Sequence, residues 1–150
     1  MRKLYWAIVE SPRVPISGES GEVETYIRFD PSSARSRILP LTETPRGAGW
    51  KKARLRWRIC GHGERYLFLE AEPLTGRTHQ IRAQLASLGM PIKGDVKYGA
   101  RRSERMGGIR LHAARVSFHD PRTGEYRTVD APIDAPDPLW LAFPGVESHG

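Results

Sequence analysis

The sequence predicts an α+β fold, in which a mostly antiparallel mixed sheet carries one principal helix. Several segments alternate apolar and polar residues, which is the pattern of strands with one buried face. One segment, residues 78–88, spaces its apolar side chains as a helix does. Turn-forming glycines and prolines separate these segments, and 150 residues are enough for one domain with a substantial core.

Six segments predict strands, namely residues 4–10, 22–29, 53–59, 65–72, 109–118 and 125–129. The first of them is apolar on both faces and is expected in the interior of the sheet. Residues 60–64 contain Gly61 and Gly63 and predict the turn of a hairpin. Residues 11–21 and 30–52 predict loops, and the longer one is either an ordered insert that faces a ligand or a mobile segment.

The principal helix is expected to be capped by the hydroxyl of Thr78. Its apolar face is formed by residues spaced four and three apart, Ile81, Leu85 and Leu88. Gly89 suits the left-handed conformation that ends a helix, and Pro91 prevents the helix from resuming. Arg77 therefore lies at a strand-to-helix junction, where its guanidinium and the helix N-terminus are both available to an anion.

A second, short helix is predicted close to the C-terminus, with Asp137 as its cap and Pro138 at its first position. Three apolar side chains are expected to dock this helix on the core, Leu139, Trp140 and Phe143. No internal repeat or low-complexity tract occurs in the chain.

Positive charge is concentrated in two parts of a chain whose formal net charge is +7. Residues 31–58 hold eight lysines and arginines against one glutamate, and residues 77–115 hold nine against two acidic residues. The remainder of the chain is therefore net negative. Most of the cations are arginines, which bind phosphate through two hydrogen bonds, and their clustering favours a nucleic-acid partner over a solvated basic surface.

Residues 53–59 place their apolar side chains on one face and three arginines on the other, Arg54, Arg56 and Arg58. Glu70 and Glu72 lie on the strand that follows in sequence. We expect the arginines to form a solvated outer face that pairs with these glutamates, in preference to binding nucleic acid directly.

The composition, 39% hydrophobic and 27% charged, is typical of a soluble globular protein. No apolar run approaches the length of a membrane span, and the first residues lack a signal-peptide cleavage pattern. Cys60 has no partner for a disulfide, which indicates a reduced compartment. We therefore expect a cytoplasmic location and no membrane partner.

Metal and cofactor chemistry are not expected from this sequence. The five histidines lack the spacing of a metal-binding helix, and paired cysteines are absent from the sequence. The sequence also has no glycine-rich nucleotide fingerprint and no serine nucleophile elbow. We predict no metal site and no cofactor.

Two consecutive stretches carry a specific resemblance. Residues 75–82 read Thr-Gly-Arg-Thr-His-Gln-Ile-Arg, and residues 89–99 contain Gly-x-Pro-Ile-x-Gly-Asp-x-x-Tyr-Gly. Together they resemble the signature of the RluA-type RNA pseudouridine synthase family. Lys3-x-Tyr5-x-Ala7-x-Val9 resembles the tyrosine strand of that family, and residues 110–113 and 118–124 resemble its later leucine strand and turn. The likeness spans most of the chain and is weakest over residues 12–50.

The resemblance implies isomerisation of uridine to pseudouridine in rRNA or tRNA, by a partial pseudouridine synthase fold. The family carries its catalytic aspartate in a segment upstream of the tyrosine strand, and here that strand begins at Lys3. We therefore expect residues 1–150 to be a single partial domain, the C-terminal half of a catalytic domain. Asp95 is the only carboxylate in the motif, but its position is not that of the catalytic aspartate, and it is expected to fix a turn by accepting backbone N–H groups.

Three pocket residues follow from the resemblance. Tyr5 would lie against the flipped base and help to remove the proton at C5, Arg77 would orient the catalytic aspartate, and Leu111 would pack on the uracil. Without the resemblance, Tyr5 and Leu111 read as core residues and Arg77 as a surface cation. His79 and Gln80 match the motif and could be purely structural.

Six further cations are candidates for phosphate contacts, Arg82, Lys93, Lys97, Arg101, Arg102 and Arg105. Three hypotheses follow for the whole chain. It is part of a synthase whose aspartate comes from a missing N-terminal half, or it is a non-catalytic RNA-binding remnant. Alternatively, it is a structural partner that self-associates through an unpaired strand edge. In the first two cases the partner is RNA.

Overall fold

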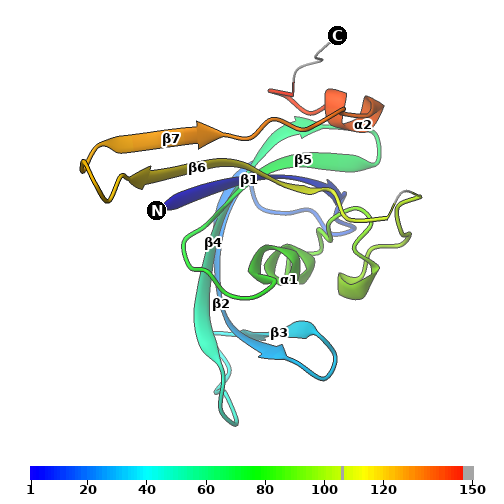
Figure 1. Ribbon diagram of the computed structural model, residues 1–150. Coiled ribbons are helices and arrows are strands. Elements are labelled where there is room, and N and C mark those ends of the chain that lie inside the picture. The colour runs from blue at the N-terminus through cyan, green and yellow to red at the C-terminus, as the bar shows by residue number, and fades with distance from the viewer. Residues whose placement is uncertain (106, 147–150) are drawn as a thin grey trace.

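The computed structural model describes residues 1–105 and 107–146 and contains one seven-stranded sheet, in the order β3-β2-β4-β5-β1-β6-β7 (Figure 1). The strands are β1 Arg2–Glu10, β2 Ser20–Asp30, β3 Arg35–Pro40, β4 Lys51–His62, β5 Tyr66–Pro73, β6 Leu111–His119 and β7 Tyr126–Asp130. All six pairings between these strands are antiparallel. The helices are α1 Gln80–Ser87, the short 3-10 helix η1 Val96–Tyr98, and α2 Pro138–Leu141. The predicted α+β class with one principal helix is confirmed.

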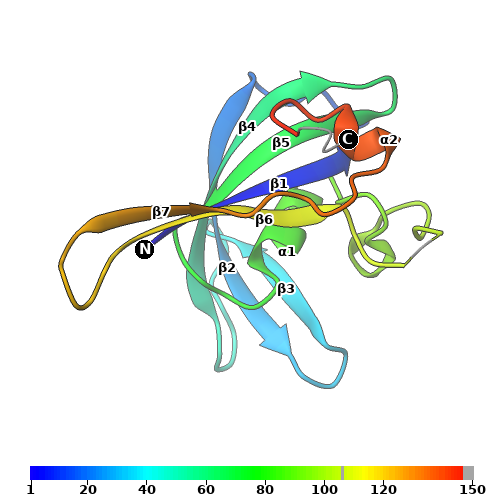
Figure 2. The same cartoon turned by 45° about the horizontal axis from the view of Figure 1, so that its top comes forward.

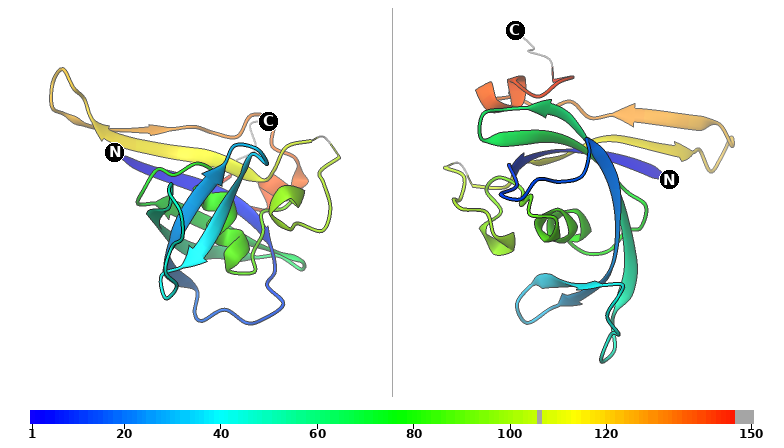
Figure 3. Two further views of the ribbon diagram at one scale, coloured as in Figure 1. Left: turned by 90° about the horizontal axis from the view of Figure 1, so that it is seen from below. Right: turned by 180° about the vertical axis from the view of Figure 1, so that it is seen from behind.

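The sheet curls around α1, so that this helix lies in its concave face, as the view from behind in Figure 3 shows. Odd-numbered residues of β1, Ala7 and Val9, pack with Ile81 and Leu85 of the helix. Ile8 points to the other face and packs with Phe143, the residue after α2 and its C-cap. The two helices thus cover opposite faces of one strand, because successive side chains of a strand point to opposite sides.

Strand β1 is interior to the sheet, as its two apolar faces predict. It pairs with β5 on one side and with β6 on the other. Ala7, Ile8 and Val9 have no exposed surface. A register shift falls between Leu4 and Tyr5 in the pairing with β6. This irregularity lies in the strand that carries the candidate pocket tyrosine.

The prediction that residues 30–52 form a loop is wrong in part, because these residues include strand β3. This strand lies at one edge of the sheet and, among the described strands, pairs with β2 alone. Ser36 is its one fully buried residue: its N–H donates to the Tyr98 hydroxyl over 2.8 Å, and its own hydroxyl donates to the carbonyl of Thr78 over 2.6 Å. Contacts with distant parts of the chain therefore stabilise β3. No local pattern in the sequence predicts these contacts.

The hairpin between β4 and β5 turns later than predicted. Strand β4 continues through Cys60 and Gly61 to His62, with a bulge between Ile59 and Gly61. A side chain at position 61 would meet the ring of Phe68 at 2.9 Å. Gly61 is therefore a site of close approach within the sheet, and not a turn residue.

The outward arginines of β4 pair with glutamates, as the alternation predicts. Arg56 reaches Glu72 over 3.4 Å, and Arg58 pairs with Glu70. Arg54 pairs instead with Glu22 of β2, on the other side of the strand. These pairs occupy the arginine face and confirm that it is a charged outer surface.

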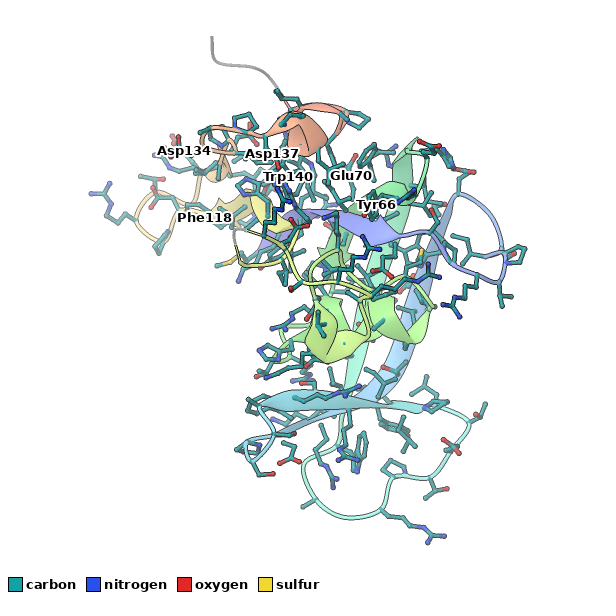
Figure 4. The ribbon with its side chains drawn as sticks, turned by 90° about the vertical axis from the view of Figure 1, so that its right-hand side faces the viewer. Tyr66, Glu70, Phe118, Asp134, Asp137 and Trp140 are labelled. Carbon is teal, nitrogen blue, oxygen red and sulfur yellow. The ribbon has the colours of Figure 1, made fainter. Side chains whose placement is uncertain are left out.

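Helix α2 begins as the sequence predicts. Asp137 is the N-cap and accepts the N–H of Trp140 over 3.0 Å, and Pro138 is the first helical residue (Figure 4). Arg110 donates to both carboxylate oxygens of Asp137, over 2.8 and 2.6 Å. These hydrogen bonds lower the pKa of Asp137 to about 2. Phe143 is buried, whereas Leu139 and Trp140 are only half-buried against it.

The described helices include none that is both long and apolar enough to cross a membrane. Within the same residues, no three His, Cys, Asp or Glu side chains gather where they could hold a metal ion.

Gly94 and Gly99 make a matched pair for testing how tightly the segment after α1 is packed. Both have positive φ, 90° and 102°, but a Cβ at Gly94 would lie 2.9 Å from the carbonyl oxygen of Gly108, whereas Gly99 has open space. We expect Gly94→Ala to lower the free energy of unfolding by about 1–3 kcal/mol more than Gly99→Ala, because a backbone atom must move. Chemical denaturation of both variants measures this difference. Equal decreases in the free energy of unfolding would show that the segment accommodates a Cβ at position 94 without added cost.

Candidate functional site

One hollow of about 490 Å³ brings together the side chains that the resemblance selected. Tyr5 of β1, Arg77 of the turn before α1 and Leu111 at the start of β6 all line it. Leu111 lies opposite Ala7 in the β1–β6 pairing, and Tyr5 is two residues from Ala7. Because the side-chain period of a strand is two, Tyr5 and Leu111 project from the same face of the sheet, and the turn brings Arg77 over that face.

Arg77 is fixed by its backbone and by one side-chain hydrogen bond. Its N–H donates to the Gln80 side-chain oxygen over 3.1 Å, and its Nε donates to the carbonyl of Lys52 over 3.1 Å. No carboxylate in the described residues forms an ion pair with it, and none lines the hollow. The terminal nitrogens of the guanidinium therefore remain available to an anion.

Gln80 braces this turn. Its side chain is almost fully buried, and its oxygen accepts hydrogen bonds from the Thr75 hydroxyl at 2.8 Å and from the Arg77 N–H. Its nitrogen donates to the carbonyl of Arg54 in β4 over 2.7 Å. One buried amide thus ties the helix to the sheet and fixes the backbone of the turn. The sequence motif includes Gln80 but gives no sign of these partners.

His79, and not Thr78, is the N-cap of α1, which corrects the predicted cap. It has a φ of 54° and makes no capping hydrogen bond through its side chain. Its Nδ1 lies 2.9 Å from the Tyr98 hydroxyl, which already accepts the N–H of Ser36. The Tyr98 hydroxyl therefore links His79, at the start of α1, to Ser36 of β3. Burial, and next the cations Arg82 and Lys97, lower the pKa of His79.

Asp95 does not fix a turn through backbone N–H groups, contrary to expectation. The carboxylate is buried and accepts two hydrogen bonds of 2.8 Å from the Arg82 guanidinium. That guanidinium also lies over the ring of Tyr98, 4.8 Å from its centre. The pair is an internal tie between α1 and the segment that follows it, and it raises the pKa of Arg82.

The six candidate phosphate contacts divide into three groups. Arg82 lines the Tyr5 hollow but is held by Asp95. Lys97 donates to the carbonyl of Ala34 over 3.0 Å. The other four line a hollow of about 730 Å³ that also contains Glu10, Glu104 and Asp137, and they are Lys93, Arg101, Arg102 and Arg105. Within this group, Lys93 is paired with Glu104.

Substitutions at Gln80 and Gln84 test whether the Gln80 side chain stabilises the Arg77 turn. Gln84 is also buried on α1 and donates to the Ala53 carbonyl of β4 and to the Thr25 hydroxyl, but its side chain forms no hydrogen bond with the described residues of the turn. We expect Gln80→Met and Gln84→Met each to lower the free energy of unfolding by about 1–3 kcal/mol, because buried partners lose hydrogen bonds. Only Gln80→Met should accelerate hydrogen exchange at the Arg77 amide. Equal exchange rates at the Arg77 amide in both variants would show that the turn keeps its conformation without the Gln80 side chain.

The lowered pKa of His79 predicts a pH dependence of stability. The unfolded chain takes up a proton near pH 6.5, whereas the folded chain resists protonation. The free energy of unfolding should therefore fall as the pH drops from about 6.5 through the lower folded-state pKa. His79→Asn, which tolerates the left-handed backbone, should remove this part of the dependence. Urea denaturation at several pH values measures the effect, and an unchanged profile in the variant would contradict it.

Comparison with known proteins identifies the family. The family model described as RNA pseudouridylate synthase matches residues 1–87, which is more than half of the chain. An uncharacterized RNA pseudouridine synthase of Chloroflexus aurantiacus is 40% identical over 136 residues, covering 90% of this chain and 40% of that protein. Ribosomal large subunit pseudouridine synthase C of Escherichia coli is 40% identical over 82 residues, 47% of this chain and 26% of that protein.

Solved structures agree in fold. The human protein RNA pseudouridylate synthase domain containing 1 superposes with a TM-score of 0.68 at 25% identity, over 88% of this chain and 54% of that one. Its counterpart, domain containing 4, gives a TM-score of 0.66 at 19% identity, over 94% and 60%, and shows the fold alone. The chain spans 40% or less of the length of the curated relatives named above. With a family model matching over half of its residues, it belongs to the RNA pseudouridylate synthase family, of the RluA type.

Proposed function

We propose that this chain is the C-terminal half of a catalytic domain that isomerises uridine to pseudouridine in rRNA or tRNA. The observation that carries the proposal is the single hollow lined by Tyr5, Arg77 and Leu111. An aromatic hydroxyl, a cation and an aliphatic side chain around one cavity suit a flat, polar base that has left its stack.

The reaction breaks the bond between C1′ and N1, turns the uracil and forms a bond between C1′ and C5, after which C5 loses its proton and N1 gains one. In this proposal Leu111 packs on the face of the uracil and Tyr5 assists removal of the C5 proton. Arg77 holds a catalytic carboxylate ionised and oriented through charge-assisted hydrogen bonds. The free terminal nitrogens of Arg77 support that role.

The carboxylate itself is proposed to come from outside the 150 residues. None of the described residues lining the hollow is Asp or Glu, and the Asp95 carboxylate forms an ion pair with Arg82. The matched relatives are more than twice as long as their aligned segments, so they have room for a further segment. On this reading the chain alone forms no pseudouridine.

Reconstitution tests the proposal. The chain is mixed with an aspartate-containing N-terminal segment of a relative and with a uridine-containing rRNA or tRNA transcript, and pseudouridine is measured by nucleoside chromatography. We expect product from the mixture and none from either part alone. Arg77→Gln in the mixture should lower the rate roughly ten- to a hundredfold, as loss of a hydrogen bond to a charged group does. Arg122→Gln, an exposed change on the loop between β6 and β7, serves as its control.

Product formed by the pure chain would contradict the assignment of the carboxylate to another segment. Binding of RNA without product in every mixture would favour the second candidate, an RNA-binding protein without catalysis. The lack of a carboxylate lining the described hollow is the observation that favours this alternative. The measured mass of the chain in solution separates both from a self-associating structural partner.

A further inference from the structure

Three hollows of the structure adjoin one another in a row, because each shares lining residues with the next. The Tyr5 hollow shares Gly76 and Arg77 with a hollow of about 340 Å³. That second hollow shares Arg28 and Ser36 with a groove of about 650 Å³ between β3 and α1. The row therefore runs from the candidate pocket over the Arg77 turn and into the groove.

Cations line all three hollows of the row. Among the described residues, the Tyr5 hollow is lined by Lys3, Arg77 and Arg82, and the second by Lys51 as well as by Arg28 and Arg77. The groove adds two arginines of β3, Arg35 and Arg37. Within residues 1–105 and 107–146, no Asp or Glu lines any of the three. The hollow at the far end of β1, in contrast, contains Glu10, Glu104 and Asp137 among its cations.

The arginines of the groove form no ion pair among the described residues, although hydrogen bonds from Ser32, to which the charge of Arg37 adds, lower the pKa of Asp30 at the end of β2. The Arg28 guanidinium lies 4.8 Å from the centre of the Trp50 ring, and that of Arg35 lies 5.4 Å from the centre of the Tyr98 ring. No ion pair among the described residues involves Arg28, Arg35 or Arg37. Stacking on an aromatic ring restrains an arginine while its N–H groups stay free for phosphate.

Helix α1 leaves room for a ligand along the groove. The residues it contributes to the lining are small, Ala83, Ala86 and Ser87. On the opposite wall, β3 is held in place by the two hydrogen bonds of Ser36, to Tyr98 and to the Thr78 carbonyl. The same Tyr98 hydroxyl contacts His79, next to the Arg77 turn. The groove and the candidate pocket are therefore parts of one rigid frame.

We propose that a single strand of the substrate RNA runs along this row, with its target base in the Tyr5 hollow and its neighbouring phosphates on Arg28, Arg35 and Arg37. The inference rests on the proposed function and adds the path of the substrate. A polymer of regularly spaced phosphates matches a row of separated cations, whereas a small anion would fill only one hollow. The six cations selected from the sequence lie, apart from Arg82, outside this path.

Fluorescence anisotropy with a labelled single-stranded oligouridylate tests the path over a salt series. Arg35→Gln/Arg37→Gln removes two charges from the groove. Arg122→Gln/Arg127→Gln removes two from the β6–β7 hairpin, which projects away from α1 and β3 in Figure 2. The groove variant should bind at least about tenfold more weakly. The slope of log K against log salt should fall by about 1.4, because each phosphate contact to a single strand contributes about 0.7. The hairpin variant should match the unaltered chain.

A second measurement uses the unaltered chain and does not depend on variant folding. Oligouridylate carrying 4-thiouridine is cross-linked by light, and the attached peptides are identified by mass spectrometry. Cross-links to β3, to Arg28 or to Trp50 support the path. Cross-links confined to residues 93–105, or a larger loss of affinity for Arg101→Gln/Arg102→Gln than for the groove variant, would overturn it. Failure of the unaltered chain to bind RNA at any salt concentration would instead contradict the proposed function itself.

Discussion

The buried amide of Gln80 is the interaction on which the candidate site depends. Its three hydrogen bonds join α1, β4 and the turn that carries Thr75 and Arg77. Burying an amide costs free energy unless its polar atoms are hydrogen-bonded, so the packing of the helix against the sheet and the fixing of the turn stabilise one another. The position of Arg77 is therefore set by the core and not by the solvent-exposed surface.

Charge is organised on the same frame. Three carboxylates in the part of the chain after α1 are each bound to a cation: Asp95 to Arg82, Glu104 to Lys93, and Asp137 to Arg110. These pairs join α1, η1, β6 and α2 to the segments around them. On the concave face beside α1, the arginines Arg28, Arg35 and Arg37 form no ion pair among the described residues.

Local patterns predicted much of this fold correctly. The two apolar faces of residues 4–10 placed β1 inside the sheet, the alternation in 53–59 gave the arginine face of β4, and Asp137 with Pro138 marked the start of α2. Such features depend on side-chain period and capping within a few residues. The motif selected Tyr5, Arg77 and Leu111 as separate positions, and the structure places them around one hollow.

The sequence by itself determined the family resemblance, the class of fold and the segregation of positive charge. Only the tertiary structure decided which cations are free. Arg82 and Lys93 read as phosphate ligands until the carboxylates of Asp95 and Glu104 are seen beside them, whereas Arg28, Arg35 and Arg37 lay in or beside a predicted loop. An ion pair between residues 11 or 13 positions apart, and an edge strand held by a tyrosine 62 residues away, leave no local periodicity to read. They arise because the curled sheet brings distant segments within bonding distance.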